Sequence, residues 1–233
     1  MDFQGRYTNK NVRIVLSYTF LNSVSRSIWG ANVLSAYVYV ITGGSNSQVG
    51  YLTGVLGTAQ VLAAPFCAYL ADRYRRDRML KVAGAWGVCC SLSTAASLVL
   101  GNYWALCLCM LGWGAFYAAS NPALEALFAD SVPLGKRSDI FTTKYMLLQA
   151  ANSTGPLLAV VMFSLLGDYW DKRECTVVVL VGLCLSVVPA LLLFTLNDRN
   201  ALDQDQAGRA EQDPEGLLLR KPLIPRHQPP APV

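Results

Sequence analysis

The chain has 233 residues, of which 53% are hydrophobic and only 15% are charged, and its formal net charge is +4. This balance is unusual for a soluble globular domain and typical of a polytopic membrane protein. The basic residues gather in short segments between apolar runs, so the positive charge does not indicate a nucleic-acid partner.

Six apolar stretches are each long enough to cross a hydrocarbon core of about 30 Å as a helix. They predict spans at residues 14–41, 49–71, 79–100, 105–129, 140–166 and 176–196, after an amino-terminal segment at 1–13. With these spans, eleven lysines and arginines fall on one side of the membrane and two, Lys172 and Arg173, on the other. We therefore expect an all-α, six-helix transmembrane bundle. Because short basic loops are retained on the cytoplasmic side of a membrane, both termini should lie in the cytoplasm.

Polar and aromatic residues interrupt the first predicted span at Asn22, Arg26, Trp29 and Asn32. On one continuous helix these four residues share a broad stripe. A charged side chain at the bilayer centre costs roughly 3 kcal/mol on insertion scales, so its presence points to a role. We interpret the stripe as a substrate-facing wall, with Arg26 neutralising an anionic group or a partner carboxylate. The alternative is that Arg26 is paired within its own bundle for structural reasons.

The second predicted span begins with Gly50 and Gly54, which share one helix face and would let a neighbouring backbone approach closely. It ends in a charge cluster, residues 68–78, that separates it from the third span. The cluster holds four arginines and is too short to be anything but a tight turn at one membrane face, which the basic residues place in the cytoplasm.

The order of Ala68, Asp72, Arg73 and Arg76 in this turn resembles the signature of the major facilitator superfamily. The turn departs from the signature at Ala68, where the family usually has glycine, and at Arg75, which replaces a second glycine. The resemblance implies that Asp72, Arg73 and Arg76 brace the two halves of a transporter in one of its alternating-access states.

The fourth predicted span contains Pro122, which bends a helix, and a second intramembrane charge, Glu125. Glu125 could carry a coupling proton, or it could pair with Lys144 or Arg137; we favour the structural reading. Antiporters of the family usually have an arginine near the position of Leu108, which is absent here. They also usually have glycine where Ala151 and Ala159 stand, although Gly155 and Pro156 are kept, so drug:proton antiport is not favoured.

Beyond the last span, residues 197–233 become polar and proline-rich, which predicts a disordered cytoplasmic tail. Asp213 followed by Leu217 and Leu218 has the form of an acidic dileucine sorting signal. The chain is therefore expected in the plasma membrane or an endolysosomal membrane. Seven cysteines occur without a Cys-x-x-Cys pair, and His227 is far from them, so we expect no metal site, disulfide framework or cofactor.

The resemblance covers residues 12–196 and corresponds to the amino-terminal six-span half of the family fold. It implies a secondary transporter that moves a small solute by alternating access, with the solute bound between two such halves. The partner would be a second six-span half or another copy of the chain, and the surroundings membrane lipid. A non-transporting half that binds or regulates full-length transporters is the alternative. An enzyme is not expected, because the spans contain no nucleophile, acid–base or metal constellation.

Overall fold

The computed structural model describes residues 9–30, 32–132, 137–167 and 169–198, with the side chain of Asp72 also outside the description. Seven α-helices and one short 3-10 turn make up this part of the chain. They are α1 (Lys10–Trp29), α2 (Asn32–Ile41), α3 (Asn46–Arg73), α4 (Arg76–Leu100), α5 (Tyr103–Ser131), α6 (Arg137–Leu166), α7 (Lys172–Leu192) and η1 (Leu193–Thr195).

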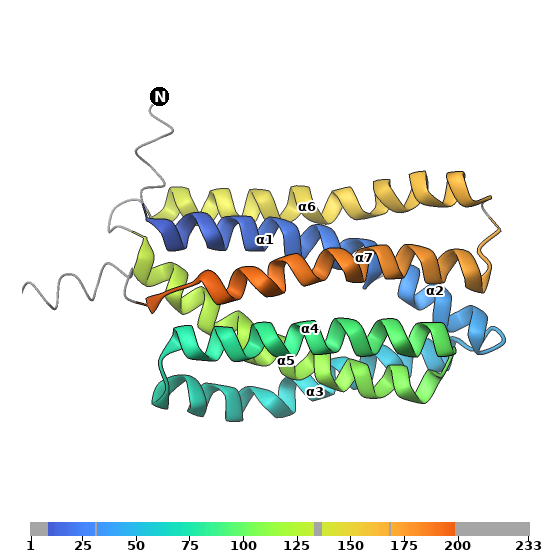
Figure 1. Cartoon of the computed structure of the whole chain (residues 1–233), viewed down its shortest axis with the longest axis horizontal. Helices are drawn as coiled ribbons and strands as arrows, with labels where there is room; N and C mark the ends of the chain where they lie inside the picture. Colours follow the sequence, from blue (N-terminus) through green and yellow to red (C-terminus); the bar gives the residue numbers. More distant parts are fainter. Residues whose placement is uncertain (1–8, 31, 133–136, 168, 199–233) are drawn as a thin grey trace, which may run out of the picture.

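The helices lie side by side along the long axis of the molecule, and the connections gather at its two ends (Figure 1). One end holds the start of α1, the turn from α3 to α4, the end of α5, the start of α6 and the end of α7. The opposite end holds the turns from α2 to α3 and from α4 to α5. Gly43 and Gly44 (φ 69° and 92°) and the left-handed helix cap Gly101 (φ 67°) reverse the chain there, in conformations that glycine adopts without strain.

Five helices are long and apolar enough to cross a membrane: α3, α4, α5, α6 and the segment Lys172–Thr195 that contains α7. The interval predicted as the first span is divided instead into α1 and α2. The amide of Gly30 closes α1 on the carbonyl of Arg26, and α2 starts two residues later. The polar residues of α1 lower its apolarity, and α2 has only 10 residues, so neither helix is long and apolar enough to cross a membrane alone.

The packing places α1 and α5 at the centre of the bundle. α1 packs along α6 and α7, while α5 packs against α3 and α4. Gly114 sets the contact of α5 with α3, because a Cβ there would lie 2.6 Å from both the Ala59 Cβ and the Leu56 carbonyl oxygen. The close approach expected at Gly50 and Gly54 is not found, since a Cβ at either would meet nothing within 4 Å.

The outer helices α3 and α6 leave most of their apolar surface uncovered. No residue in the most apolar stretch of α3 is buried, and in the most apolar stretch of α6 the buried share is 17%. Large side chains such as Phe66 on α3 (73% exposed) and Leu165 on α6 (82% exposed) lie on these faces. Such surface is costly in water and suits a hydrocarbon environment or a second helical bundle.

Candidate functional site

An aromatic cluster joins α1 to α5 in the middle of the bundle. The Trp29 ring of α1 lies 5.0 Å from the Trp113 ring of α5, centroid to centroid, and Trp113 stacks on Tyr117 at 5.7 Å. The indole N–H of Trp113 donates to the Thr94 hydroxyl of α4 at 3.1 Å, which fixes the orientation of the ring. Trp29 is only 2% exposed, and within the described residues its own indole N–H has no hydrogen-bond partner.

Arg26 lies one turn before Trp29 and completes the cluster with a charge. Its guanidinium carbon is 4.5 Å from the centroid of the Tyr117 ring, within the range of a cation–π contact. The residue is exposed, and no carboxylate in the described ranges forms an ion pair with it. An exposed guanidinium can bind an anionic group, whereas the rings of Trp29, Trp113 and Tyr117 are almost completely buried and hold the charge in place from behind.

The remaining two residues of the predicted stripe are less well grouped. Asn22 lies one turn before Arg26 on α1 and is half-buried. Asn32 is exposed and begins α2, so the division of the first span separates it from the helix that carries the other three. The structure therefore brings Arg26 and Trp29 together around the α5 rings, with Asn22 beside them and Asn32 on the next helix.

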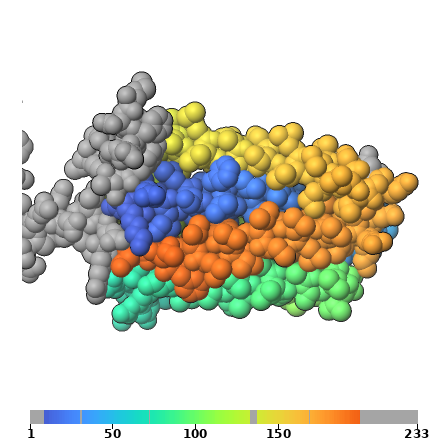
Figure 2. Space-filling model, turned by 45° about the horizontal axis from the view of Figure 1, so that its top comes forward, coloured from blue at the N-terminus to red at the C-terminus, as the bar shows by residue number. Residues whose placement is uncertain are grey.

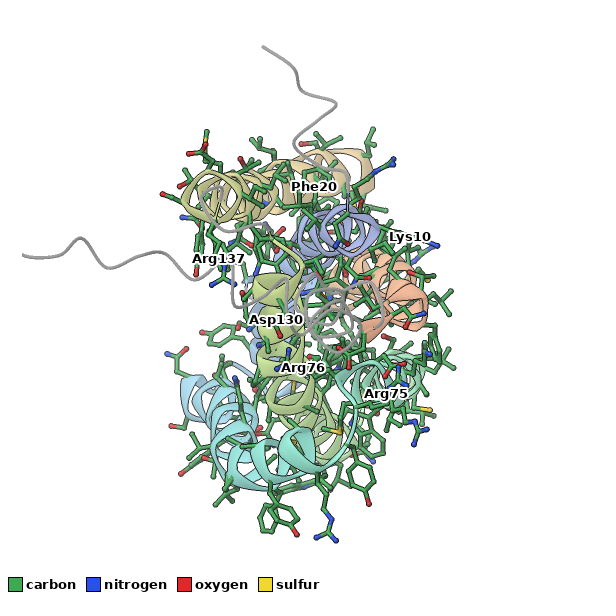
Figure 3. The ribbon with its side chains drawn as sticks, turned by 90° about the vertical axis from the view of Figure 1, so that its left-hand side faces the viewer. Lys10, Phe20, Arg75, Arg76, Asp130 and Arg137 are labelled. Carbon is green, nitrogen blue, oxygen red and sulfur yellow. The ribbon has the colours of Figure 1, made fainter. Side chains whose placement is uncertain are left out.

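The basic turn between α3 and α4 is held by short-range polar contacts at one end of the bundle. Arg76, the first residue of α4, forms an ion pair with Asp130 near the end of α5, and the two lie next to each other in Figure 3. Arg73 donates to the Tyr69 hydroxyl at 2.8 Å. The role expected of the Asp72 side chain falls outside the described residues. Arg76 thus ties the turn to a helix of the same bundle.

Glu125 of α5 pairs with Lys144 of α6, one of the two partners expected for it. Lys144 is 5% exposed, and its ammonium nitrogen lies 4.9 Å from the centroid of the Phe128 ring. The Glu125 side chain is 49% exposed, so one side of the pair reaches the surface. This contact neutralises the buried cation and links two helices.

Sequence reasoning did not name Trp113, Tyr117 or Asp130 as partners of the candidate residues. A signal for the first two exists, because Trp113, Phe116 and Tyr117 fall three and four residues apart and so share one face of α5. Asp130 carries no comparable signal. Its pairing with Arg76 depends on how α4 and α5 lie against each other, which the local sequence does not state.

A bundle of long apolar helices with a polar, aromatic interior face and a basic turn at one end defines an integral, multi-pass membrane protein. A sequence model of the Major Facilitator Superfamily matches residues 15–230. The chain therefore belongs to this family of secondary transporters, which handle small solutes.

A curated relative is similar over part of this region. Multidrug resistance protein MdtG of Proteus mirabilis (strain HI4320) is 27% identical over 155 residues, which is 64% of this chain and 38% of the relative. The part of the chain that matches therefore covers well under half of the relative.

Proposed function

We propose that the chain takes part in the secondary transport of a small solute by alternating access. Asn22, Arg26 and Asn32 face the solute, and Trp29 of the predicted stripe is buried behind them against the Trp113 ring. The exposed guanidinium of Arg26, resting on the Tyr117 ring without a carboxylate partner in the described ranges, is the observation that carries this proposal. A cation without a counter-charge is costly inside a membrane protein unless a ligand or a partner neutralises it. The solute that fits is a small molecule with an anionic group, because the exposed guanidinium is the group that can contact it.

The six crossings of this proposal comprise residues 14–196, with α1 and α2 together forming the first. Both termini, 1–13 and 197–233, then lie in the cytoplasm, because the basic residues of the described helices gather at one end of the bundle. The bundle works beside a second six-span bundle, which covers the exposed faces of α3 and α6. The host membrane is the plasma membrane or an endolysosomal membrane.

Asp72, Arg73 and Arg76 change their contacts as the transporter alternates between its two open states. The ion pair of Arg76 with Asp130 supports this role, because it fixes the turn to the end of α5 in one conformation. Glu125 serves chiefly to neutralise Lys144, as their contact favours. A coupling proton on Glu125 is the competing role, and its half-exposed position leaves water access to the carboxylate.

The name of the relative, a multidrug resistance protein, suggests drugs as a substrate class for this chain. Two features point elsewhere. Leu108 occupies the position at which proton-coupled drug antiporters usually carry an arginine. Arg26 is positively charged and would repel a cationic compound, which an acidic site would attract. An anionic solute therefore fits the described residues better.

Flux into liposomes that contain the purified chain tests the proposal, with a panel of radiolabelled anionic and cationic solutes. We expect uptake of an anionic solute that falls at least tenfold in Arg26→Ala and recovers partly in Arg26→Lys, which keeps the charge but not the planar fork. Uptake that does not change in Arg26→Ala would remove Arg26 from the site. A chain that transports none of the solutes, yet co-purifies with full-length members of the family, would support the regulatory alternative instead.

A further inference from the structure

The start of α1 borders a surface hollow that the transport site does not use. The hollow has a volume of about 520 Å³ and is lined by Lys10, Arg13, Ile14, Ser17 and Leu192. Figure 2 shows the same part of α1 exposed as a strip between α6 and α7, near one end of the bundle. Lys10 lies at the outer rim of that end in Figure 3. In the described part of the chain, the hollow therefore lies on the outer surface of the bundle.

The hollow and the proposed solute site occupy opposite faces of α1. With about 100° of rotation per residue, Lys10 and Arg26 are separated by roughly 160° around the helix axis. Arg26 faces α5 through Tyr117, whereas Lys10 and Arg13 are exposed beside α7. A ligand of the hollow is therefore distinct from the transported solute, and it would meet the protein from the side of the lipid.

The lining divides into a charged outer part and an apolar inner part. Lys10 and Arg13 supply two positive charges. Among the described residues, no acidic side chain lines the hollow and neither cation forms an ion pair. Ile14 and Leu192 supply apolar surface next to the charges. Because a helix rises about 1.5 Å per residue, the wall from Lys10 to Ser17 extends roughly 10 Å along α1, the depth over which a headgroup gives way to acyl chain.

A buried side chain of α1, that of Asn11, connects the first turn of this helix to the segment after α7. The Asn11 amide nitrogen donates to the Asn197 carbonyl oxygen at 2.8 Å and to the Ser131 hydroxyl at 3.3 Å. Asn11 itself is fully buried. These contacts fix the segment after α7 against the first turn of α1, so the spacing between the two basic residues and Leu192 is set before any ligand binds.

We propose that this hollow binds the headgroup of an anionic phospholipid, with the phosphate between Lys10 and Arg13 and the first acyl carbons against Ile14 and Leu192. Basic pockets between membrane helices suit such headgroups, and the charge of the lining excludes a net cationic ligand. The Ser17 hydroxyl is placed to donate to a glycerol or ester oxygen. The site does not depend on the transport proposal, because it lies on another face of the bundle.

Native mass spectrometry of the purified full chain, titrated in detergent with phosphatidylglycerol or phosphatidylcholine, tests this site. We expect tighter binding of the anionic lipid. Arg13→Gln and Lys10→Gln should each weaken it about fivefold, the equivalent of about 1 kcal/mol for one basic residue near the surface. Arg13→Lys, which keeps the charge, should retain most of the affinity and show that the fold is intact.

Arg78→Gln is the matched control, because Arg78 is exposed in the first turn of α4 at the same end of the bundle but does not line the hollow. It should change the affinity less than twofold. If Arg78→Gln weakened lipid binding as much as the two hollow variants, the lipid would be attracted by the overall positive charge of this end, and the proposal would be overturned. Equal binding of phosphatidylcholine would also overturn it, as would displacement of the lipid by inorganic phosphate at constant ionic strength, which would indicate a site for a free anion.

Discussion

Arg26 on α1 and Lys144 on α6 are both basic residues within the helices of the bundle, but their surroundings differ. Lys144 is almost completely buried, pairs with Glu125 and lies over the Phe128 ring. Arg26 is exposed and lies over the Tyr117 ring, without a carboxylate partner among the described residues. Each cation has an aromatic neighbour, and only Lys144 has a counter-charge.

The difference separates a structural charge from one that can bind a ligand. A buried cation that is paired with a carboxylate of its own bundle has little attraction left for a solute. An exposed cation on an aromatic surface keeps its attraction for an anion, at the cost of an incompletely neutralised charge in the empty protein. The rings then serve different purposes, since Phe128 shields an existing pair and Tyr117 holds Arg26 in position.

The largest effect is expected when the counter-charge of Lys144 is removed. Glu125→Gln leaves a buried ammonium group without a carboxylate, and we expect the free energy of unfolding to fall by about 3 kcal/mol, the low end for such a change because Glu125 is half-exposed. Unfolding of the purified chain in mixed micelles, followed by tryptophan fluorescence, measures this. The double variant Glu125→Gln with Lys144→Met should recover most of the loss. Equal stability of Glu125→Gln and the unmodified chain would contradict a structural role for the pair.

The second prediction tests the contact between the two helices that carry these cations. A Cβ at Gly155 of α6 would lie 2.1 Å from the Ser27 hydroxyl oxygen and 2.4 Å from the Ser27 carbonyl carbon on α1, so Gly155→Ala must push the helices apart. We expect a loss of about 2 kcal/mol in the same unfolding experiment, typical of overpacking. Gly50→Ala is the matched control, because a Cβ there meets nothing within 4 Å and alanine favours a helix. A loss of stability in Gly50→Ala alone would reverse this account of the packing.

The helical class and the approximate positions of the later long helices follow from the sequence, because a hydrocarbon core demands long local runs of apolar residues. The end of α1 at Trp29 did not follow, since the apolar residues after Gly30 continue the pattern of the first span. The partner of Glu125 was among those expected, because Lys144 lies in the adjacent predicted span. The Tyr117 ring beneath Arg26 was not foreseen, because it depends on how α1 and α5 cross.

The third prediction examines whether the ring positions Arg26. Tyr117→Leu removes the π surface and keeps an apolar side chain, so we expect the affinity for an anionic solute to fall roughly fivefold, in line with about 1 kcal/mol for a cation–π contact. Tyr117→Phe keeps the ring and should retain most of the affinity. The intrinsic fluorescence of Trp29 and Trp113, which adjoin the site, reports the binding. Equal affinities in the Leu and Phe variants would show that the ring does not matter.

The smallest effect is expected at the ion pair between Arg76 and Asp130, which offers a third setting for a basic residue. Both side chains are partly exposed, at 37% and 29%, so water screens the pair and its contribution to stability should be about 0.5 kcal/mol. A double-mutant cycle with Arg76→Gln and Asp130→Asn measures the coupling energy without the other contacts of either residue.

A coupling energy above about 2 kcal/mol would place this pair with Lys144 and Glu125 as a structural element. A small coupling energy together with a changed transport rate would instead mean that the pair breaks and re-forms during the cycle, since a contact that must open repeatedly cannot be strong.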